Sequence, residues 1–135
     1  MKVLVCGGRD FRNYTLLDRV LFTHVSLHDD ALICGYDPAD KRFQGADQLA
    51  WNWAGVNGVI RRHFPARWDD ITAPGARVKI DRAGRSYNAN AGPDRNQLMA
   101  DEKPDICIAF PGGAGTADMV RRARKAGIGV VEIKP

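Results

Sequence analysis

Cysteines are few in this sequence, and their spacing excludes a disulfide scaffold. The three cysteines, Cys6, Cys34 and Cys107, are an odd number and have no CxxC spacing. Each lies in or beside a short apolar run, so we interpret all three as small buried residues with reduced thiols. A catalytic cysteine would need a histidine partner, and the sequence does not identify one.

Long hydrophobic runs are also missing, which excludes a membrane-spanning helix. No stretch approaches the roughly 18 apolar residues of a membrane span, and the apolar run of residues 1–5 is too short for a signal peptide. We therefore expect a cytoplasmic protein with no membrane partner. The 135 residues suit one domain, and the hydrophobic fraction of 44% is that of a globular protein.

The familiar phosphate-binding motifs are absent too. The GxGxxG register that begins at Gly113 and Gly115 has Asp118 where the third glycine should stand, and GxxxxGK[ST] does not occur. This disfavours a standard dinucleotide-binding fold or an ATPase. His24 and His28 have an i, i+4 spacing that could hold a metal, but no third ligand is evident. We expect no metal and no cofactor.

Several short apolar runs are nearly continuous rather than alternating, as strands are when a parallel sheet is covered on both faces. They are residues 3–6, 31–34, 106–110 and 128–133, with a weaker strand at 58–64. Segments with helical spacing lie between them. We predict a single α/β domain, residues 1–135, with a Rossmann-like, doubly wound parallel sheet of about five strands and helices on both faces.

The predicted helices have apolar faces that should lie on this sheet. The first should follow the cap Asn13, the third should open at Pro93, and the fourth should begin near Thr116. The expected buried faces are Leu17, Val20, Leu21 and His24; Ala46, Leu49, Ala50 and Trp53; Leu98 and Met99; and Met119, Val120, Ala123 and Ala126.

Two predicted loops are long for such a domain, at residues 35–45 and 69–91. Within the second, residues 77–80 and 85–87 could pair as a hairpin around the turn 81–84. Long loops are often functional lids, and they are also tolerated as surface insertions. Both interpretations stay open.

Glycine-bearing segments directly follow predicted strands and should meet at one edge of the sheet, where ligands bind. Glycine lets backbone N–H groups approach phosphate oxygens, and a helix amino terminus adds partial positive charge. The net charge of +4 suits an anionic ligand but is modest for a duplex-binding protein. The candidate ligand-binding residues in these segments are Gly7, Gly8, Arg9, Gly45, Asp47, Gly112, Gly113, Gly115 and Thr116.

Arg95 lies on the same predicted helical face as Leu98 and Met99, so it should point toward the protein and needs an anion. That anion could be a structural carboxylate such as Asp105 or Asp10. We favour the other alternative, a ligand phosphate.

Taken in order along the chain, these segments resemble a known family. They include Cys6 to Phe11, Gly45 to Asp47, Trp68-Asp69, Ala91 to Pro93 with Arg95-Asn96, and Pro111 to Met119. The set resembles the YspA-type, cpYpsA-related branch of the SLOG superfamily. Relatives include the LOG phosphoribohydrolases, the DNA-uptake protein DprA and nucleotide-signal sensors. The resemblance implies a Rossmann-like sheet, a small nucleotide-like ligand, and Asn96 as a further ligand-binding residue.

The sequence departs from the hydrolytic relatives at one position. Their PGGxGTxxE motif is present through Thr116, but Met119 stands where the glutamate falls, while Arg95 matches the family's arginine. The neighbouring Asp118 should face away from the sheet and serve as a first-turn acid of the fourth helix. The second loop also departs, since residues 36–44 replace a compact glycine pair.

Three functions compete on these observations. We favour binding of a nucleotide or ADP-ribose-like ligand by a sensor, carrier or sequestering protein. The alternative is an N-glycosidic hydrolase of a nucleoside monophosphate, in which Asp47, Asp10 or Asp69 would supply the missing carboxylate. Single-stranded DNA binding is disfavoured, because the basic residues are scattered rather than gathered in a groove with aromatics.

Trp51 falls roughly 140° around the second helix from its buried face and should lie outside the core. An exposed large aromatic residue suggests an interface, so we predict a homodimer through this helix. Alternatively, a long loop folds over Trp51.

Overall fold

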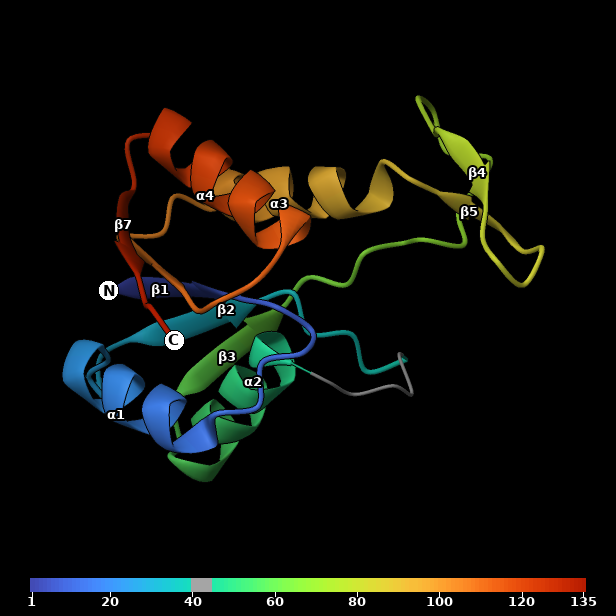
Figure 1. Ribbon diagram of the computed structural model, residues 1–135. Helices are drawn as coiled ribbons and strands as arrows, with labels where there is room; N and C mark the ends of the chain where they lie inside the picture. The colour runs from blue at the N-terminus through green and yellow to red at the C-terminus, as the bar shows by residue number, and fades with distance from the viewer. Residues whose placement is uncertain (40–44) are drawn as a thin grey trace.

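Five parallel strands form the central sheet of the computed structural model, which describes residues 1–39 and 45–135 (Figure 1). The strand order is β3-β2-β1-β6-β7, and every neighbouring pair is parallel. The strands are β1 (Lys2–Cys6), β2 (Ala31–Cys34), β3 (Ile60–His63), β6 (Ile106–Ala109) and β7 (Gly129–Glu132). The predicted doubly wound, single-domain α/β fold is confirmed.

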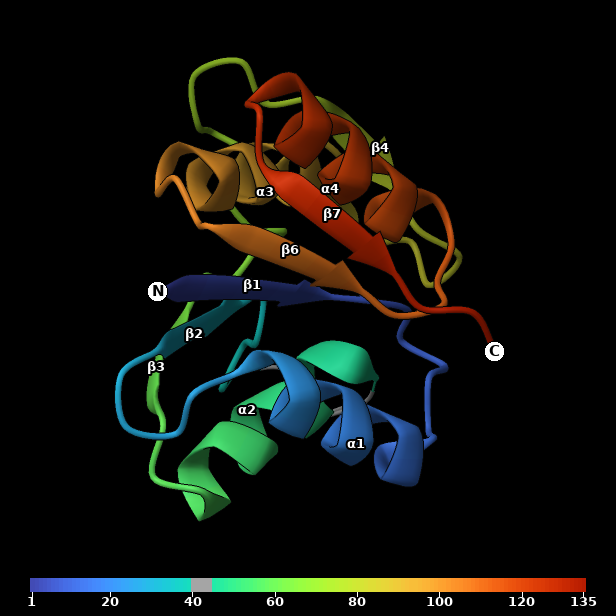
Figure 2. The same ribbon diagram turned by 90° about the vertical axis from the view of Figure 1, so that its left-hand side faces the viewer.

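Helices cover both faces of this sheet. In Figure 2, α1 (Tyr14–His24) and α2 (Ala46–Val56) lie on one face, and α3 (Ala91–Asp101) and α4 (Ala114–Lys125) lie on the other. Alternate residues of β1 enter different hydrophobic clusters, Val3 and Val5 on the α1–α2 side and Leu4 and Cys6 on the α3–α4 side. Because both faces are buried, the strand needs apolar residues at every position.

The predicted cap of the first helix is confirmed, because Asn13 Oδ1 accepts a hydrogen bond from the amide of Leu16 at 3.0 Å. Two predicted core positions are wrong. Leu98 is 58% exposed, since α3 turns Asn96, Met99 and Ala100 inward. Ala126 is exposed because α4 ends at Lys125.

The starts of two helices also differ from the prediction. α3 begins at Ala91 rather than at Pro93, and α4 begins at Ala114 rather than near Thr116. Proline is compatible with any position of the first turn, because the first amides of a helix have no intrahelical acceptor. The motif residues Gly115 and Thr116 therefore belong to the first turn of α4.

The second long loop contains the predicted hairpin, β4 (Val78–Ile80) paired antiparallel with β5 (Ser86–Asn88). Asp81 Oδ1 closes its turn by accepting from the amides of Ala83 and Arg85, each at 2.9 Å. The hairpin projects away from the sheet in Figure 1, and its base is held by the amide of Asn88, which donates to the carbonyl of Trp68 at 2.7 Å.

Of the first long loop, residues 40–44 lie outside the described part of the chain. Within the described residues, no helix has the length and apolar character needed to cross a membrane.

Candidate ligand-binding site at the carboxyl edge of the sheet

A cavity of about 480 Å³ opens where the loops after β1 and β6 meet the starts of α2, α3 and α4. Its size is within the range of small-molecule sites. Most of the residues predicted to bind a ligand line it, namely Gly7, Gly8, Arg9, Asp47, Arg95, Asn96, Gly113, Gly115 and Thr116. Residues far apart in the sequence are therefore gathered at one edge of the sheet.

The two glycine loops touch each other through their main chains. The amide of Gly8 donates to the carbonyl of Pro111 at 2.9 Å. A Cβ atom added at Gly8 would lie 2.9 Å from the Cα of Gly112, and one added at Gly7 would lie 2.9 Å from the Cβ of Phe110. Glycine is required at Gly8 because the loops pack backbone to backbone, and at Gly7 because the side chains of Ala46 and Phe110 occupy the space.

The start of α4, in contrast to these packed loops, has unpaired amides and open space around its glycines. Its N-cap, Gly113, provides no side-chain cap, and the amides of Gly113 to Thr116 donate to no acceptor in the described part of the chain. A Cβ atom at Gly113 or Gly115 would have nothing within 4 Å. The helix thus presents unpaired N–H groups and the positive end of its dipole to the cavity, a combination that favours anions.

Arg95 extends from α3 into the cavity and is held by main-chain oxygens. Its Nη1 donates to the carbonyls of Gly35 at 3.0 Å and Phe64 at 3.2 Å, and its Nε donates to Asn96 Oδ1 at 3.1 Å. Neither Asp105 nor Asp10, the two carboxylates considered as alternative partners of Arg95, is among these partners. Its Nη2 donates to no oxygen within the described residues, so part of the guanidinium can bind an anion.

Asp47, in the first turn of α2, lines the same cavity. Its Oδ1 accepts weakly from the amide of Gly35, at 3.4 Å. Burial raises the pKa of this carboxyl above its usual value, and the nearby positive charge of Arg95 opposes that shift only in part. Asp47 is thus a carboxyl that keeps its proton to a higher pH than an exposed aspartate.

Asn96 and Asp118 join α3 to α4 at the cavity wall. The buried Asn96 donates from Nδ2 to the carbonyl of Gly115 at 3.2 Å and to Asp118 Oδ2 at 3.0 Å. Burial raises the pKa of Asp118, but hydrogen bonds from Arg122 and Asn96 outweigh it and hold that pKa below its usual value. Because its amide atoms are engaged in this way, Asn96 positions the start of α4.

The predicted place of Asp118 is wrong. It belongs to the second turn of α4, which begins at Ala114, and it lines the cavity instead of facing away. Arg122 Nε donates to it at 2.9 Å, and Arg121 also pairs with it.

Trp68, Met99 and Met119 form an apolar part of the lining. A Cβ atom at Gly92 would lie 2.8 Å from Cη2 of Trp68, so glycine lets the indole lie directly on the first turn of α3. Trp68-Asp69 is among the segments that carry the family resemblance, but Trp68 was not predicted to line the site, because it stands in an irregular segment without periodicity. Met119, which stands where the resemblance implies a glutamate in the hydrolytic relatives, is 1% exposed.

Comparison with known proteins identifies the family of this chain. A family model described as the YspA, cpYpsA-related SLOG family matches residues 1–70. The chain belongs to this family. The Gene 61 protein of Mycobacterium phage D29 is 30% identical over 132 residues, which cover 96% of this chain and 94% of that protein. No solved structure matches. SLOG membership is compatible with nucleotide-related binding and names no ligand.

Four predicted site residues of this SLOG domain lie outside the cavity lining. Gly45 has φ of 94°, and a Cβ there would lie 2.5 Å from the carbonyl oxygen of Gly8, so it serves loop packing. Gly112 packs against Gly8 in the same way. Asp10 lines a neighbouring hollow, and Asp69 is exposed and lines neither space.

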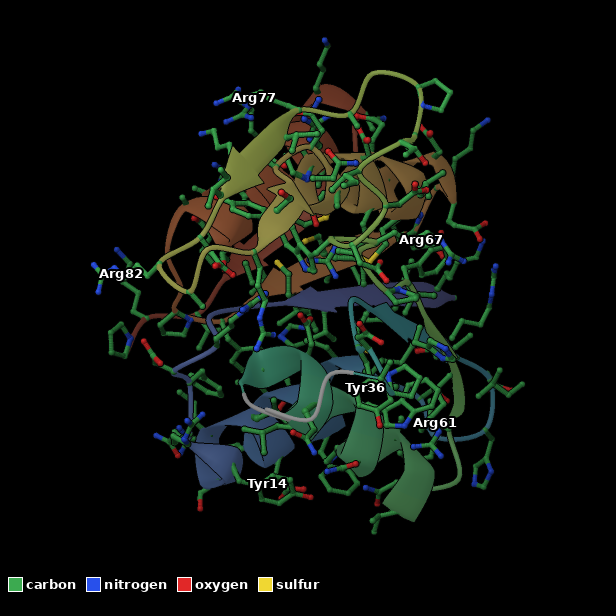
Figure 3. All side chains as sticks on the ribbon, turned by 90° about the vertical axis from the view of Figure 1, so that its right-hand side faces the viewer. Tyr14, Tyr36, Arg61, Arg67, Arg77 and Arg82 are labelled. Atoms are coloured by element: carbon green, nitrogen blue, oxygen red, sulfur yellow. The ribbon has the colours of Figure 1, made fainter. Side chains whose placement is uncertain are left out.

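Trp51 lies on the surface of α2 but is covered. Its ring stacks on Tyr36 at a centroid distance of 4.8 Å, and the guanidinium of Arg61 lies 4.0 Å above it. Figure 3 shows Tyr36 and Arg61 side by side at this helix. Tyr36, from the described start of the long loop, and Arg61 of β3 therefore cover Trp51, which is half-buried. The homodimer stays a prediction.

The cysteines lie within the core as free, buried thiols. Burial raises the pKa of the Cys34 thiol, and contact with Cys107 and burial raise that of Cys6, so both thiols stay protonated at neutral pH. In the described part of the chain, no three His, Cys, Asp or Glu side chains are grouped to hold a metal.

Proposed function

We propose that this SLOG domain binds a nucleotide or nucleotide-derived ligand, acting as a sensor, carrier or sequestering protein, with the ligand's phosphate at the start of α4. One observation carries the proposal. The unpaired amides of Gly113 to Thr116 line the same cavity as the guanidinium of Arg95. Backbone N–H groups and a guanidinium are the donors that proteins use for phosphate.

The open space at Gly113 and Gly115 supports the same proposal. Glycine at Gly8 and Gly112 is explained by contacts within the protein, but at Gly113 and Gly115 no internal contact requires it. Neither Gly113 nor Gly115 has a positive φ, so backbone conformation does not require glycine at these two positions. Their missing side chains leave room for a group that must come within hydrogen-bond distance of the amides.

Binding is favoured over catalysis by the lining itself. Met119 is a thioether, which cannot stabilise a developing positive charge as a carboxylate does. The adjacent Asp118 is paired with Asn96 and Arg122. Loss of one electrostatic partner of a charged transition state typically costs on the order of a hundredfold in rate. Binding survives this loss, because main-chain donors need no carboxylate.

The phosphate site can be tested with an added charge that the fold tolerates. Gly115→Asp places a carboxylate in open space within the first helical turn, where acids are favourable for the helix. We expect unchanged or higher thermal stability and at least tenfold weaker binding of nucleoside monophosphates by calorimetry. Ala117→Asp adds the same charge to the same helix outside the cavity lining and is the matched control. Equal affinity in both variants and the wild type would refute the proposal.

A hydrolase of the N-glycosidic bond is the second candidate, and Asp47 favours it. Among the carboxylates considered, Asp47 lines the cavity, and its raised pKa is typical of a general acid or base. In such a reaction, water would add to the anomeric carbon while the base leaves with a proton. We expect slow or no release of base from nucleoside monophosphates. Multiple-turnover release that Asp47→Asn abolishes would favour this second function.

A further inference from the structure

Sulfur-bearing side chains gather between the sheet and the layer of α3 and α4. Two of the three cysteines and two of the three methionines of the sequence belong to the hydrophobic cluster in this space (Figure 2). They are Cys6 of β1, Cys107 of β6, Met99 of α3 and Met119 of α4. Cys6 and both methionines also line the cavity, so a solute that enters the cavity can reach this cluster.

The two thiols meet across neighbouring strands. Leu4 is opposite Cys107 and Cys6 is opposite Ala109, so the two cysteines are diagonal neighbours on one face of the sheet. Their Sγ atoms are 4.0 Å apart. This contact lowers the pKa of the Cys107 thiol and raises that of Cys6, so Cys107 loses its proton more readily.

The backbone spacing at these strands disfavours a disulfide between the two thiols. A strand separation of about 4.8 Å and an offset of two residues put the two Cα atoms about 8 Å apart. A disulfide needs Cα atoms within about 7 Å of each other unless the backbone moves. The two sulfur atoms are thus close without being able to bond in this backbone, and a bridging cation can join them.

The separation of the two sulfur atoms matches a bridging cation with three ligands. Metal–sulfur bonds in proteins are about 2.3 Å long, and two such bonds span the 4.0 Å between the Sγ atoms at an angle of about 120°. The third ligand must come from the helices above the sheet. α4 packs directly on β6, and its Met119 is 1% exposed in the same cluster as the two cysteines.

The chemistry of these ligands selects the cation. Thiolate and thioether are soft ligands, which favour Cu(I) over hard cations such as Mg²⁺. A monovalent cation that replaces one thiol proton leaves the buried site with no net charge, which avoids the cost of burying an unpaired charge. The proton would come from Cys107, and it passes to the solvent.

We infer that Cys6, Cys107 and Met119 form a three-coordinate site for a soft monovalent cation, Cu(I). One thiol proton is released on binding, and no electron is transferred. The site gives Met119 a chemical role, because a thioether binds a soft cation at the position where the resemblance implies a glutamate in the hydrolytic relatives. The inference does not rest on the proposed phosphate site, whose donors are amides and a guanidinium.

Competition for Cu(I) tests the site. We would titrate the full chain with Cu(I) without oxygen, against bicinchoninate, a chelator whose copper complex is coloured. We expect the protein to take one equivalent, and Cys6→Ala and Cys107→Ala each to weaken binding at least a hundredfold. The matched control is Cys34→Ala, which removes a buried thiol of β2 from the opposite hydrophobic cluster and should leave the affinity unchanged.

The third ligand is tested with leucine, which conserves the volume of methionine and is tolerated in cores. Met119→Leu should weaken Cu(I) binding at least tenfold, and Met99→Leu less than threefold. Circular dichroism checks that each variant is folded. If the wild type takes no Cu(I) from the chelator, or if Cys6→Ala and Cys107→Ala bind it as tightly as the wild type, the inference is wrong. Equal effects of the two leucine variants would remove Met119 from the site.

Discussion

The glycines of the two loops differ in what surrounds them, although they lie within a few residues of one another. Gly7, Gly8 and Gly112 are pressed against the protein's own atoms, so a Cβ atom would force the loops apart. Gly113 and Gly115 have open space where a Cβ atom would lie. Folding explains the first group, and the proposed ligand would explain the second. Variants at Gly8, Gly115 and Arg95 test that division.

The largest effect should come from the packed group. Gly8→Ala brings Cβ to 2.9 Å from the Cα of Gly112, and we expect a loss of about 3 kcal/mol in the free energy of unfolding, measured with urea. Gly115→Ala should be neutral or stabilise by up to about 1 kcal/mol, because alanine favours the helix. Equal losses in the two variants would remove the distinction between the groups.

Substitution of Arg95 tests whether the open side of the glycine loops binds a phosphate. Arg95→Ala should weaken nucleoside monophosphate binding by about 2 kcal/mol, roughly thirtyfold, because a charged contact is lost. It also leaves the carbonyls of Gly35 and Phe64 without this donor, so stability should fall as well. Arg95→Lys keeps the charge, and the exposed Arg19→Ala serves as control. Lower thermal stability with unchanged affinity would make Arg95 purely structural.

Asp47 should produce a smaller effect that depends on pH. Because its pKa is raised in the folded protein, its contribution to stability is fully present at low pH and is lost as pH rises through that pKa. The stability of Asp47→Asn relative to the wild type should therefore increase as pH rises from 4 to 8, by on the order of 0.5 kcal/mol. Urea unfolding at several pH values measures this difference in stability, and Asp69→Asn, at an exposed position, is the control. A difference that shrinks with rising pH would contradict the raised pKa.

At Trp51, loop packing and an interface compete as explanations for one surface aromatic residue. If α2 forms a homodimer, Trp51→Lys should convert the dimer to a monomer in light scattering at micromolar concentration. If the contacts with Tyr36 and Arg61 are sufficient, the mass should not change, and stability should fall by about 1 kcal/mol. A wild-type monomer would rule out the dimer.

The fold could be predicted from the sequence because each local signal agrees with the whole structure. Continuous apolar runs require a sheet buried on both faces, and Asn13 has the side chain that caps a helix. The inward residues of α3 could not be predicted as well. Its periodicity is interrupted by polar residues, and Asn96 is buried where Leu98 was expected, because Asn96 finds hydrogen-bond partners on α4.

The sequence by itself determined the order of strands and helices along the chain, the positions of the glycine loops and the family. These features depend on neighbouring residues and short spacings. Only the tertiary structure decided which of those residues share a cavity. Trp68 joins the lining and Gly45 does not, and Arg95 is held by the carbonyls of Gly35 and Phe64 rather than by a carboxylate. These contacts join residues that are distant in the sequence, and no local pattern records which distant surfaces meet when the helices pack on the sheet.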